Sequence, residues 1–303
     1  MTIHEEAGMH ATALARRAAP WAPLALSLAF LGAAAALVRG APDDVPGLEV
    51  ATGEDVVDAV LDLSFPLVGA LILVRRPRNL FAWAFCAVGL CFEASLFAGG
   101  YGTYATFTHP GALPGAQLMS LLSDLLFVVT LVLFLAFVPL LFPTGAPPTR
   151  RWWAVGAAAG AAVALAWTAM AIRPGPVDED VPSSGANPLG IAGAGGVADA
   201  LELAAVVLLF AAVLASFASV IVRTRRASGP ERRQQHLFLS GSAVIVAVFL
   251  LPDDRLGLSG PVAQIALALV ALLALPLAAA LALLREPDET RMPPPEIEPA
   301  HTV

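Results

Sequence analysis

The chain has 303 residues, of which 58% are hydrophobic and only 14% charged, and its mean hydropathy is +0.77. Soluble domains carry about 25% charged residues, so this composition excludes an ordinary soluble protein. All 17 basic residues are arginines, and the 24 acidic residues bring the net charge to −7. Because the two signs of charge gather in different loops, the net value does not point to a nucleic-acid partner.

Long apolar segments dominate the chain. About 20 apolar residues suffice to cross the hydrocarbon core of a bilayer as a helix, and eight segments reach or approach this length. They are Trp21–Val38, Val56–Val74, Leu80–Phe97, Gln117–Phe142, Trp152–Ile172, Val197–Val222, Leu237–Leu251 and Val262–Leu284. The seventh has only 15 residues, a length that also fits a re-entrant segment.

The predicted fold is therefore an all-α, polytopic membrane bundle of about eight transmembrane helices. We divide the chain into an N-terminal segment (residues 1–20), one transmembrane domain (21–284) and a proline-rich tail (285–303) that we expect to be disordered. The first span has a poor cleavage site after it, so we expect it to remain as a membrane helix.

The arginines predict the orientation of the bundle. If the eight segments alternate in direction, 14 of the 17 arginines fall on one face, and the opposite face holds only Arg39, Arg173 and Arg255. Arginine-rich loops stay in the cytoplasm. We therefore predict that both termini are cytoplasmic and that the acidic loops face outward.

Four acidic residues lie in the outer halves of predicted spans. Ionisable groups at membrane depth are costly, and by default they suggest function. The four are Asp62, Glu93, Asp124 and Glu202, and no arginine falls inside a predicted span to neutralise them. One interpretation is a shared polar cavity that binds a cationic ligand or senses protons. The other is a set of separate acids, each hydrogen-bonded locally with a structural role, and the sequence leaves both open.

The longest basic loop lies on the predicted cytoplasmic face. Its five arginines are expected to bind anionic lipid headgroups or a cytoplasmic partner. They are Arg223, Arg225, Arg226, Arg232 and Arg233.

Glycine, proline and cysteine predict local features of the spans. Gly156 and Gly160 form a small-xxx-small pair that permits close helix approach. Pro139 is expected to kink the fourth span. Cys86 and Cys91 are five positions apart on one predicted helix, a spacing that places them on different faces and predicts no disulfide.

Three motifs resemble a known family when taken together and in order. They are Leu-Phe-Pro-Thr-Gly-Ala-Pro-Pro-Thr-Arg-Arg-Trp at 141–152, Asn-Pro-Leu-Gly at 187–190, and Arg-Arg-Ala-Ser-Gly-Pro-Glu-Arg-Arg-Gln-Gln at 225–235. This pattern is similar to the N-terminal membrane sensor region of sensor histidine kinases from high-GC Gram-positive bacteria. The resemblance implies a multi-pass protein of the bacterial cell membrane, with a sensor-like role in signal transduction.

The chain departs from those kinases after the last span. The 19 residues after Leu284 contain no phosphoacceptor or ATP-binding domain, so we expect the input half alone. Such a module would signal through a separate cytoplasmic kinase or regulator, and homo-oligomerisation is a further open alternative. Membrane lipids are the other expected partner, and nucleic acid is not expected.

Three functions follow as hypotheses. The first is a non-enzymatic sensor-like or accessory module. The second is a small-solute or cation/proton transporter that uses the intramembrane carboxylates, although no internal repeat of the kind expected for alternating access is present. The third is an intramembrane enzyme, against which the chain has no metalloprotease, nucleophile-elbow or phosphate-loop motif. We expect no enzymatic activity, no cofactor and no metal site.

Overall fold

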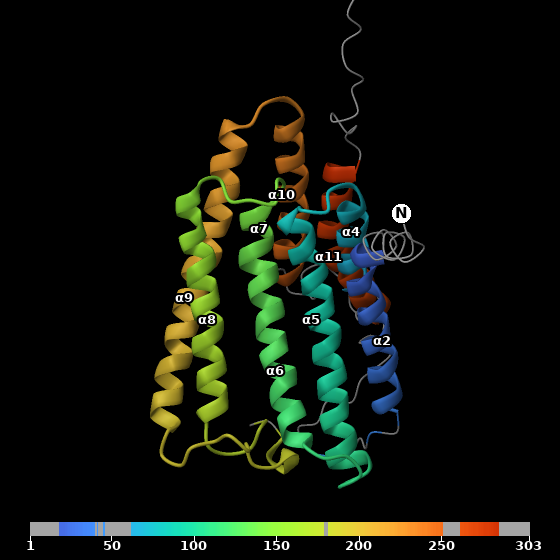
Figure 1. The fold of residues 1–303 in the computed structure, drawn as a ribbon, viewed down its shortest axis with the longest axis vertical. Helices are drawn as coiled ribbons and strands as arrows, with labels where there is room; N and C mark the ends of the chain where they lie inside the picture. Colours follow the sequence, from blue (N-terminus) through green and yellow to red (C-terminus); the bar gives the residue numbers. More distant parts are fainter. Residues whose placement is uncertain are drawn as a thin grey trace, which may run out of the picture.

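The computed structural model describes residues 18–39, 41, 45, 62–178, 181–250 and 261–284. Within these residues it is all-helical, as predicted, and the β-structure there amounts to one isolated bridge between Pro176 and Ala186. Long helices lie side by side, and the described connections between them lie at the two ends of the bundle (Figure 1). The predicted all-α class is confirmed.

The helices follow the predicted apolar segments along the chain. In order they are η1 (Ala19–Trp21), α2 (Ala22–Leu37), α4 (Ser64–Arg75), α5 (Leu80–Thr103), the π-helical turn η2 (Tyr104–Thr108), α6 (Ala116–Val132), the π-helical turn η3 (Leu133–Phe137), α7 (Val138–Leu141), η4 (Arg150–Trp152), α8 (Trp153–Ile172), η5 (Pro182–Ser184), α9 (Gly195–Arg226), α10 (Gly229–Leu250) and α11 (Pro261–Leu284).

Five helical stretches in the described residues are long and apolar enough to cross a membrane. They are Ala19–Leu37, Leu80–Thr108, Ala116–Leu141, Arg150–Ile172 and Gly195–Arg226. These correspond to the first, third, fourth, fifth and sixth predicted spans. The chain thus has the helices of an integral membrane protein.

The other three predicted spans are less complete, so the count of eight stays a prediction. The second is represented by α4, which has 12 residues, and its predicted start at Val56 lies outside the described residues. The seventh corresponds to α10, which begins eight residues earlier than predicted, at Gly229, so its first two turns are polar. The eighth matches α11 almost residue for residue, and its shorter part Leu273–Leu284 is apolar.

Helix α5 lies at the centre of the bundle and packs against α2, α4 and α6. Glycine permits the close approach of α4: a Cβ on Gly89 would lie 2.3 Å from Cδ of Pro66, and one on Gly69 would lie 2.5 Å from Sγ of Cys86. Helices α8 and α9 form a second pair, with α8 also contacting α6. Cys86 and Cys91 are free thiols in α5, as expected.

Of the two glycines that were predicted to permit close helix approach in α8, only Gly156 lies at a helix contact. Gly156 faces Phe137, whose ring would lie 3.3 Å from an added Cβ. Gly160 is exposed, and an added Cβ there would meet nothing within 4 Å. The two positions differ because α8 turns Gly160 away from its neighbours and packs through buried alanines instead, Ala159 and Ala162 among them.

The predicted kink at Pro139 takes a specific form. A proline inside a helix lacks an N–H donor and its ring crowds the preceding turn. The chain accommodates this by the π-helical turn η3, directly before the short helix α7 in which Pro139 occupies one of the first two positions. Wide turns of this kind are frequent at functional sites.

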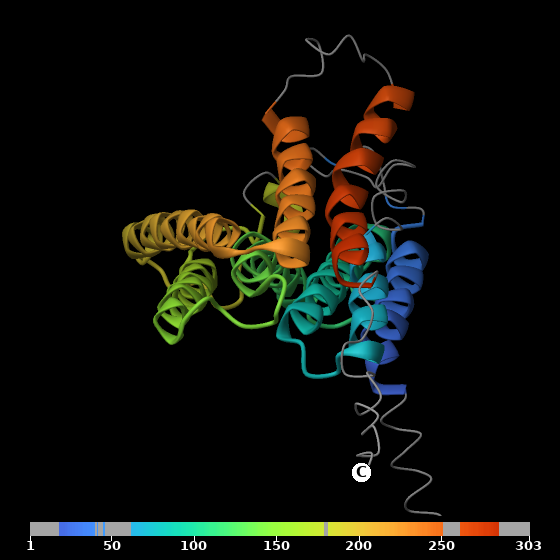
Figure 2. The same cartoon turned by 90° about the horizontal axis from the view of Figure 1, so that it is seen from above.

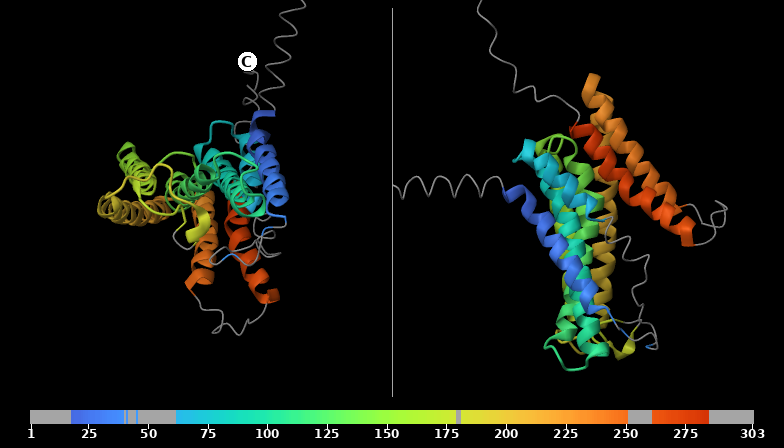
Figure 3. Two further views of the ribbon diagram at one scale, coloured as in Figure 1. Left: turned by 90° about the horizontal axis from the view of Figure 1, so that it is seen from below. Right: turned by 90° about the vertical axis from the view of Figure 1, so that its right-hand side faces the viewer.

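Helices α10 and α11 form a hairpin that contacts the rest of the bundle at one end and diverges from it at the other (Figures 2 and 3). At that end α11 packs against α4, and the ring of Phe238 in α10 stacks on Phe142 with 4.3 Å between centroids. A guanidinium N–H of Arg75 also donates to the Leu284 carbonyl at 3.2 Å. Phe142 and Phe238 are fully buried.

Candidate functional site

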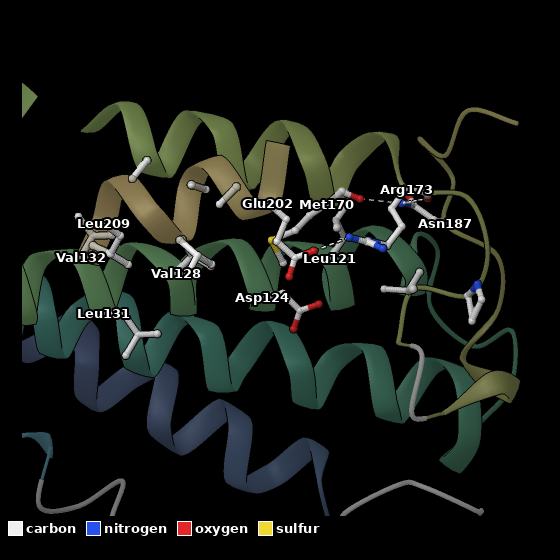
Figure 4. A pocket seen from close by; sticks show the side chains of 16 residues that line it. Leu121, Asp124, Val128, Leu131, Val132, Met170, Arg173, Asn187, Glu202 and Leu209 are labelled. Carbon is white, nitrogen blue, oxygen red and sulfur yellow. Dashed lines mark hydrogen bonds and ion pairs between the residues drawn. The ribbon is translucent and has the colours of Figure 1, made fainter. Parts of the chain in front are cut away.

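A cavity of about 460 Å³ lies between α6, α8 and α9. This volume is within the usual range of small-molecule sites. Its two ends differ in polarity (Figure 4). The polar end contains Asp124, Arg173, Asn187 and Glu202, next to the loop between α8 and α9. The other end is apolar and is lined by Val128, Leu131, Val132, Leu209 and neighbouring alanines.

Asp124 and Glu202 place two carboxylates at similar depth in this cavity. Asp124 is eight residues past the start of α6 and Glu202 seven past the start of α9, which corresponds to about 12 and 10 Å along the helices. Their side chains point into the same space (Figure 4). The sequence-based hypothesis of a shared cavity is therefore realised for these two residues.

Arg173 neutralises part of the charge at the polar end. It caps the end of α8, and its guanidinium donates to Asp199 at 2.9 Å and to Glu202. The prediction that Glu202 lacks a basic partner is thus wrong. No arginine lies inside a predicted span, but Arg173 follows α8 directly and its side chain reaches α9.

Asp124 is the carboxylate that keeps no such partner. It makes no hydrogen bond or ion pair with any residue that the structure describes, and it is exposed to the cavity. Asp178, which interacts with it electrostatically, is also acidic. The same side chain borders a smaller hollow of about 210 Å³, whose other polar residues include Ser120 and Ser123. Asp124 is therefore the group in this cavity most able to attract a cation.

Asn187 holds the loop over the cavity. Its side-chain N–H groups donate to the Met170 and Arg173 carbonyls, each at 2.9 Å, and to the Ala171 carbonyl at 3.3 Å. Its Oδ1 accepts from the Leu189 N–H at 3.0 Å, an Asx-type turn. These bonds satisfy the free carbonyls at the C-terminus of α8. The Asn-Pro-Leu-Gly motif thus has a structural role, because it seals α8 beside the polar end.

Glu93 and Asp62 lie elsewhere, so the four predicted acids do not share one cavity. Glu93 belongs to α5 and is fully buried, and neither carboxyl oxygen finds a hydrogen-bond partner within the described part of the chain. Asp62 is near enough to interact with it electrostatically. The Asp62 carbonyl lies beside Gly89, one turn before Glu93. Neither residue lines the cavity between α6, α8 and α9.

The burial of Arg223 contradicts the prediction that all five arginines of the basic loop bind lipid or a partner. Arg223 is 8% exposed, because α9 continues to Arg226 and turns this residue inward. Its guanidinium donates to the carbonyls of Leu140 and Phe142 and, at 3.0 Å, to that of Ala146. We call this set of contacts the Arg223 clamp. Arg225, Arg226, Arg232 and Arg233 are exposed, and they remain candidates for lipid or partner contacts.

The Arg223 clamp explains the Leu-Phe-Pro-Thr-Gly motif. Phe142 and Pro143 are joined by a cis peptide bond, and Gly145 adopts a φ of +79° that favours glycine. A Cβ on Gly145 would also lie 2.7 Å from the Leu80 nitrogen at the start of α5. Since the turn cannot pair all its carbonyls internally, Arg223 satisfies them from α9.

The roles of Arg173 and Asn187 at the cavity end of the bundle, and of Arg223 at the opposite end, were not predicted from the sequence. Asn187 was visible within a motif, but its role needed the position of the α8 end. Arg223 was grouped with loop arginines because the apolar segment ends at Val222. A helical projection of α9 beyond that point would have placed Arg223 on the same face as the buried residues Ser216 and Ser219.

Comparison of the chain with protein-family models, with curated proteins and with solved structures finds no match. We therefore infer a function from the cavity and the Arg223 clamp.

Proposed function

We propose that the chain is a non-enzymatic, sensor-like module of the cell membrane that crosses the bilayer eight times with both termini in the cytoplasm. In this proposal, occupancy of the cavity between α6, α8 and α9 changes the position of the basic loop at the opposite end. A separate cytoplasmic kinase or regulator then recognises the new position of that loop by binding to it. The resemblance to sensor regions of bacterial histidine kinases supports the same assignment.

One observation carries the proposal: two helices connect the cavity to the Arg223 clamp. Asp124, Val128 and Val132 of α6 line the cavity, and the same helix leads through η3 and α7 to Phe142. Glu202 and Leu209 line it from α9, which then carries Arg223. Packed helices move as units rather than deforming continuously. A change in the separation of α6 and α9 at the cavity would therefore change the contacts of Arg223 in the clamp.

The clamp in turn reaches the basic loop. Arg223 is followed within three residues by the end of α9, and the exposed residues Arg225, Arg226 and Ser228 follow from it. Phe142 stacks on Phe238 of α10, which begins at Gly229 on the other side of this loop. Both helices that flank the loop thus contact the clamp.

The ends at which the loops lie support the proposed orientation. The loops after α4 and after α9 lie at the same end of the bundle as η4 (Figure 1), and most of the described arginines lie in these segments and in the adjoining helix ends. The loop over the cavity lies at the opposite end (Figure 1). Under the positive-inside rule the cavity then opens toward the outside.

A labelling experiment tests both orientation and coupling. Ser228→Cys in a Cys86→Ala, Cys91→Ala background should react with a membrane-impermeant maleimide from the cytoplasmic side only. Adding Ala166→Phe, which fills the cavity from α8, should change that labelling rate about fivefold, equivalent to a coupling of about 1 kcal/mol. Ala157→Phe is the matched control, because Ala157 lies on the exposed face of the same helix.

Two results would refute the proposal. Labelling of residue 228 from the outside would reverse the orientation. Equal labelling rates in the Ala166→Phe and Ala157→Phe variants would remove the coupling between cavity and loop.

A further inference from the structure

We infer that the cavity between α6, α8 and α9 binds an amphipathic cation, with its ammonium group at Asp124 and its apolar chain between α6 and α9. This inference rests on the proposed function, because it names the ligand of the same cavity. The charge and the shape of the cavity support it.

The charge of the polar end favours a cationic ligand. Among the described residues that line the cavity, the polar end has the carboxylates of Asp124 and Glu202 and the single guanidinium of Arg173, which also pairs with Asp199 beside the cavity. Arg173 is engaged by the two acids of α9, whereas Asp124 faces it from α6 without a bond. A cleft that carries an excess of one sign of charge attracts ligands of the opposite sign. A positively charged group beside Asp124 would supply the missing partner, and an anion would be repelled.

The shape of the cavity favours a ligand in which an apolar chain is attached to the charged group. From Asp124 to Leu131 the cavity follows α6 for about 10 Å, and its wall changes from polar to wholly apolar over that length. A small inorganic cation would leave this apolar part empty. A hydrated solute would place polar groups against Val128, Val132 and Leu209, which offer no hydrogen bonds. A hexyl chain fits within the length and buries its surface there.

Two sources could supply this chemistry. One is a free amphiphilic amine or quaternary ammonium compound that enters from the water. The other is the ammonium headgroup of an ethanolamine lipid whose chain lies against the bundle. The shared element is an ammonium group beside Asp124, and the lipid composition of the assay separates the two sources.

The test uses the full chain in nanodiscs and hexyltrimethylammonium as the probe, with isothermal titration and subtraction of empty nanodiscs. We expect saturable binding in phosphatidylglycerol nanodiscs and none for hexanesulfonate, which has the same chain and the opposite charge. Asp124→Asn should weaken binding by about tenfold or more, because the attraction of the charge is lost. Glu93→Gln is the matched control: it removes a helix carboxylate outside the cavity and should leave the affinity unchanged.

The lipid arm repeats the titration in nanodiscs that contain phosphatidylethanolamine. Weaker apparent binding there assigns the site to the lipid headgroup, and unchanged binding assigns it to a free cation. Equal binding of hexanesulfonate, the absence of binding to the wild-type chain, or an unchanged affinity in Asp124→Asn would each overturn the inference.

The labelling experiment on residue 228 separates this inference from the proposed function, because it needs no ligand. If Ala166→Phe changes the labelling of residue 228 while hexyltrimethylammonium fails to bind, the ligand class is wrong and the sensor-like role stands. If the probe binds through Asp124 but neither the probe nor Ala166→Phe changes the labelling, the ligand class stands and the coupling is refuted.

Discussion

Replacement of Arg223 by methionine probes a buried arginine whose guanidinium donates to three backbone carbonyls. Methionine keeps much of the volume but removes every hydrogen bond from the guanidinium to the carbonyls of Leu140, Phe142 and Ala146. The variant therefore tests whether α9 is fastened to the turn after α7 by those bonds or by apolar packing alone.

The size of the effect can be worked from these contacts. Hydrogen bonds from a charged donor contribute about 1.5 kcal/mol each at the low end, so three amount to about 4.5 kcal/mol. Part of this is offset, because the variant no longer buries a charge. We expect a net loss of about 2–3 kcal/mol in the free energy of unfolding, which would lower the Tm by about 5–10 °C.

The assay is thermal unfolding of the purified protein in one detergent, followed by near-UV circular dichroism. Arg225→Met is the matched control, since it removes the same charge from an exposed residue of the same helix end. Equal Tm values for the two variants would refute the reasoning, because they would show that the carbonyls of the turn do not depend on Arg223.

Two further predictions concern the loop over the cavity and the central helix pair. Asn187→Ala removes the side-chain donors that cap α8 and should lower the stability of the loop at 173–194 by about 1–2 kcal/mol. We expect faster thermolysin cleavage of this loop, and cleavage at the wild-type rate would contradict the prediction. Gly89→Ala forces a Cβ to within 2.3 Å of Pro66 and should lower the Tm, because α4 and α5 must separate. Gly160→Ala, which meets nothing within 4 Å, should keep or raise the Tm, since alanine favours a helix by about 1 kcal/mol; a greater loss at Gly160 than at Gly89 would overturn the packing argument.

The candidate site was predictable in its parts and not in its grouping. Asp124 and Glu202 were identified because a carboxylate inside an apolar segment is conspicuous. Their union in one cavity, apart from Glu93 and Asp62, depends on which helices are neighbours. The pairing of α8 with α9 beside α6 cannot be derived from apolar periodicity, because α8 is apolar on almost every side and both α8 and α9 are rich in alanine along their length.

The amino-acid sequence by itself determined the helical class, the approximate bounds of the apolar helices and the segregation of arginine to one end of the bundle. These follow from local rules, since an apolar segment of sufficient length must satisfy its own backbone hydrogen bonds as a helix. Only the tertiary structure decided that Arg173 pairs with the acids of α9 and that Arg223 turns inward to three carbonyls. Those roles join residues that are 26 to 83 positions apart, and they arise where the ends of packed helices leave backbone groups that another element must satisfy.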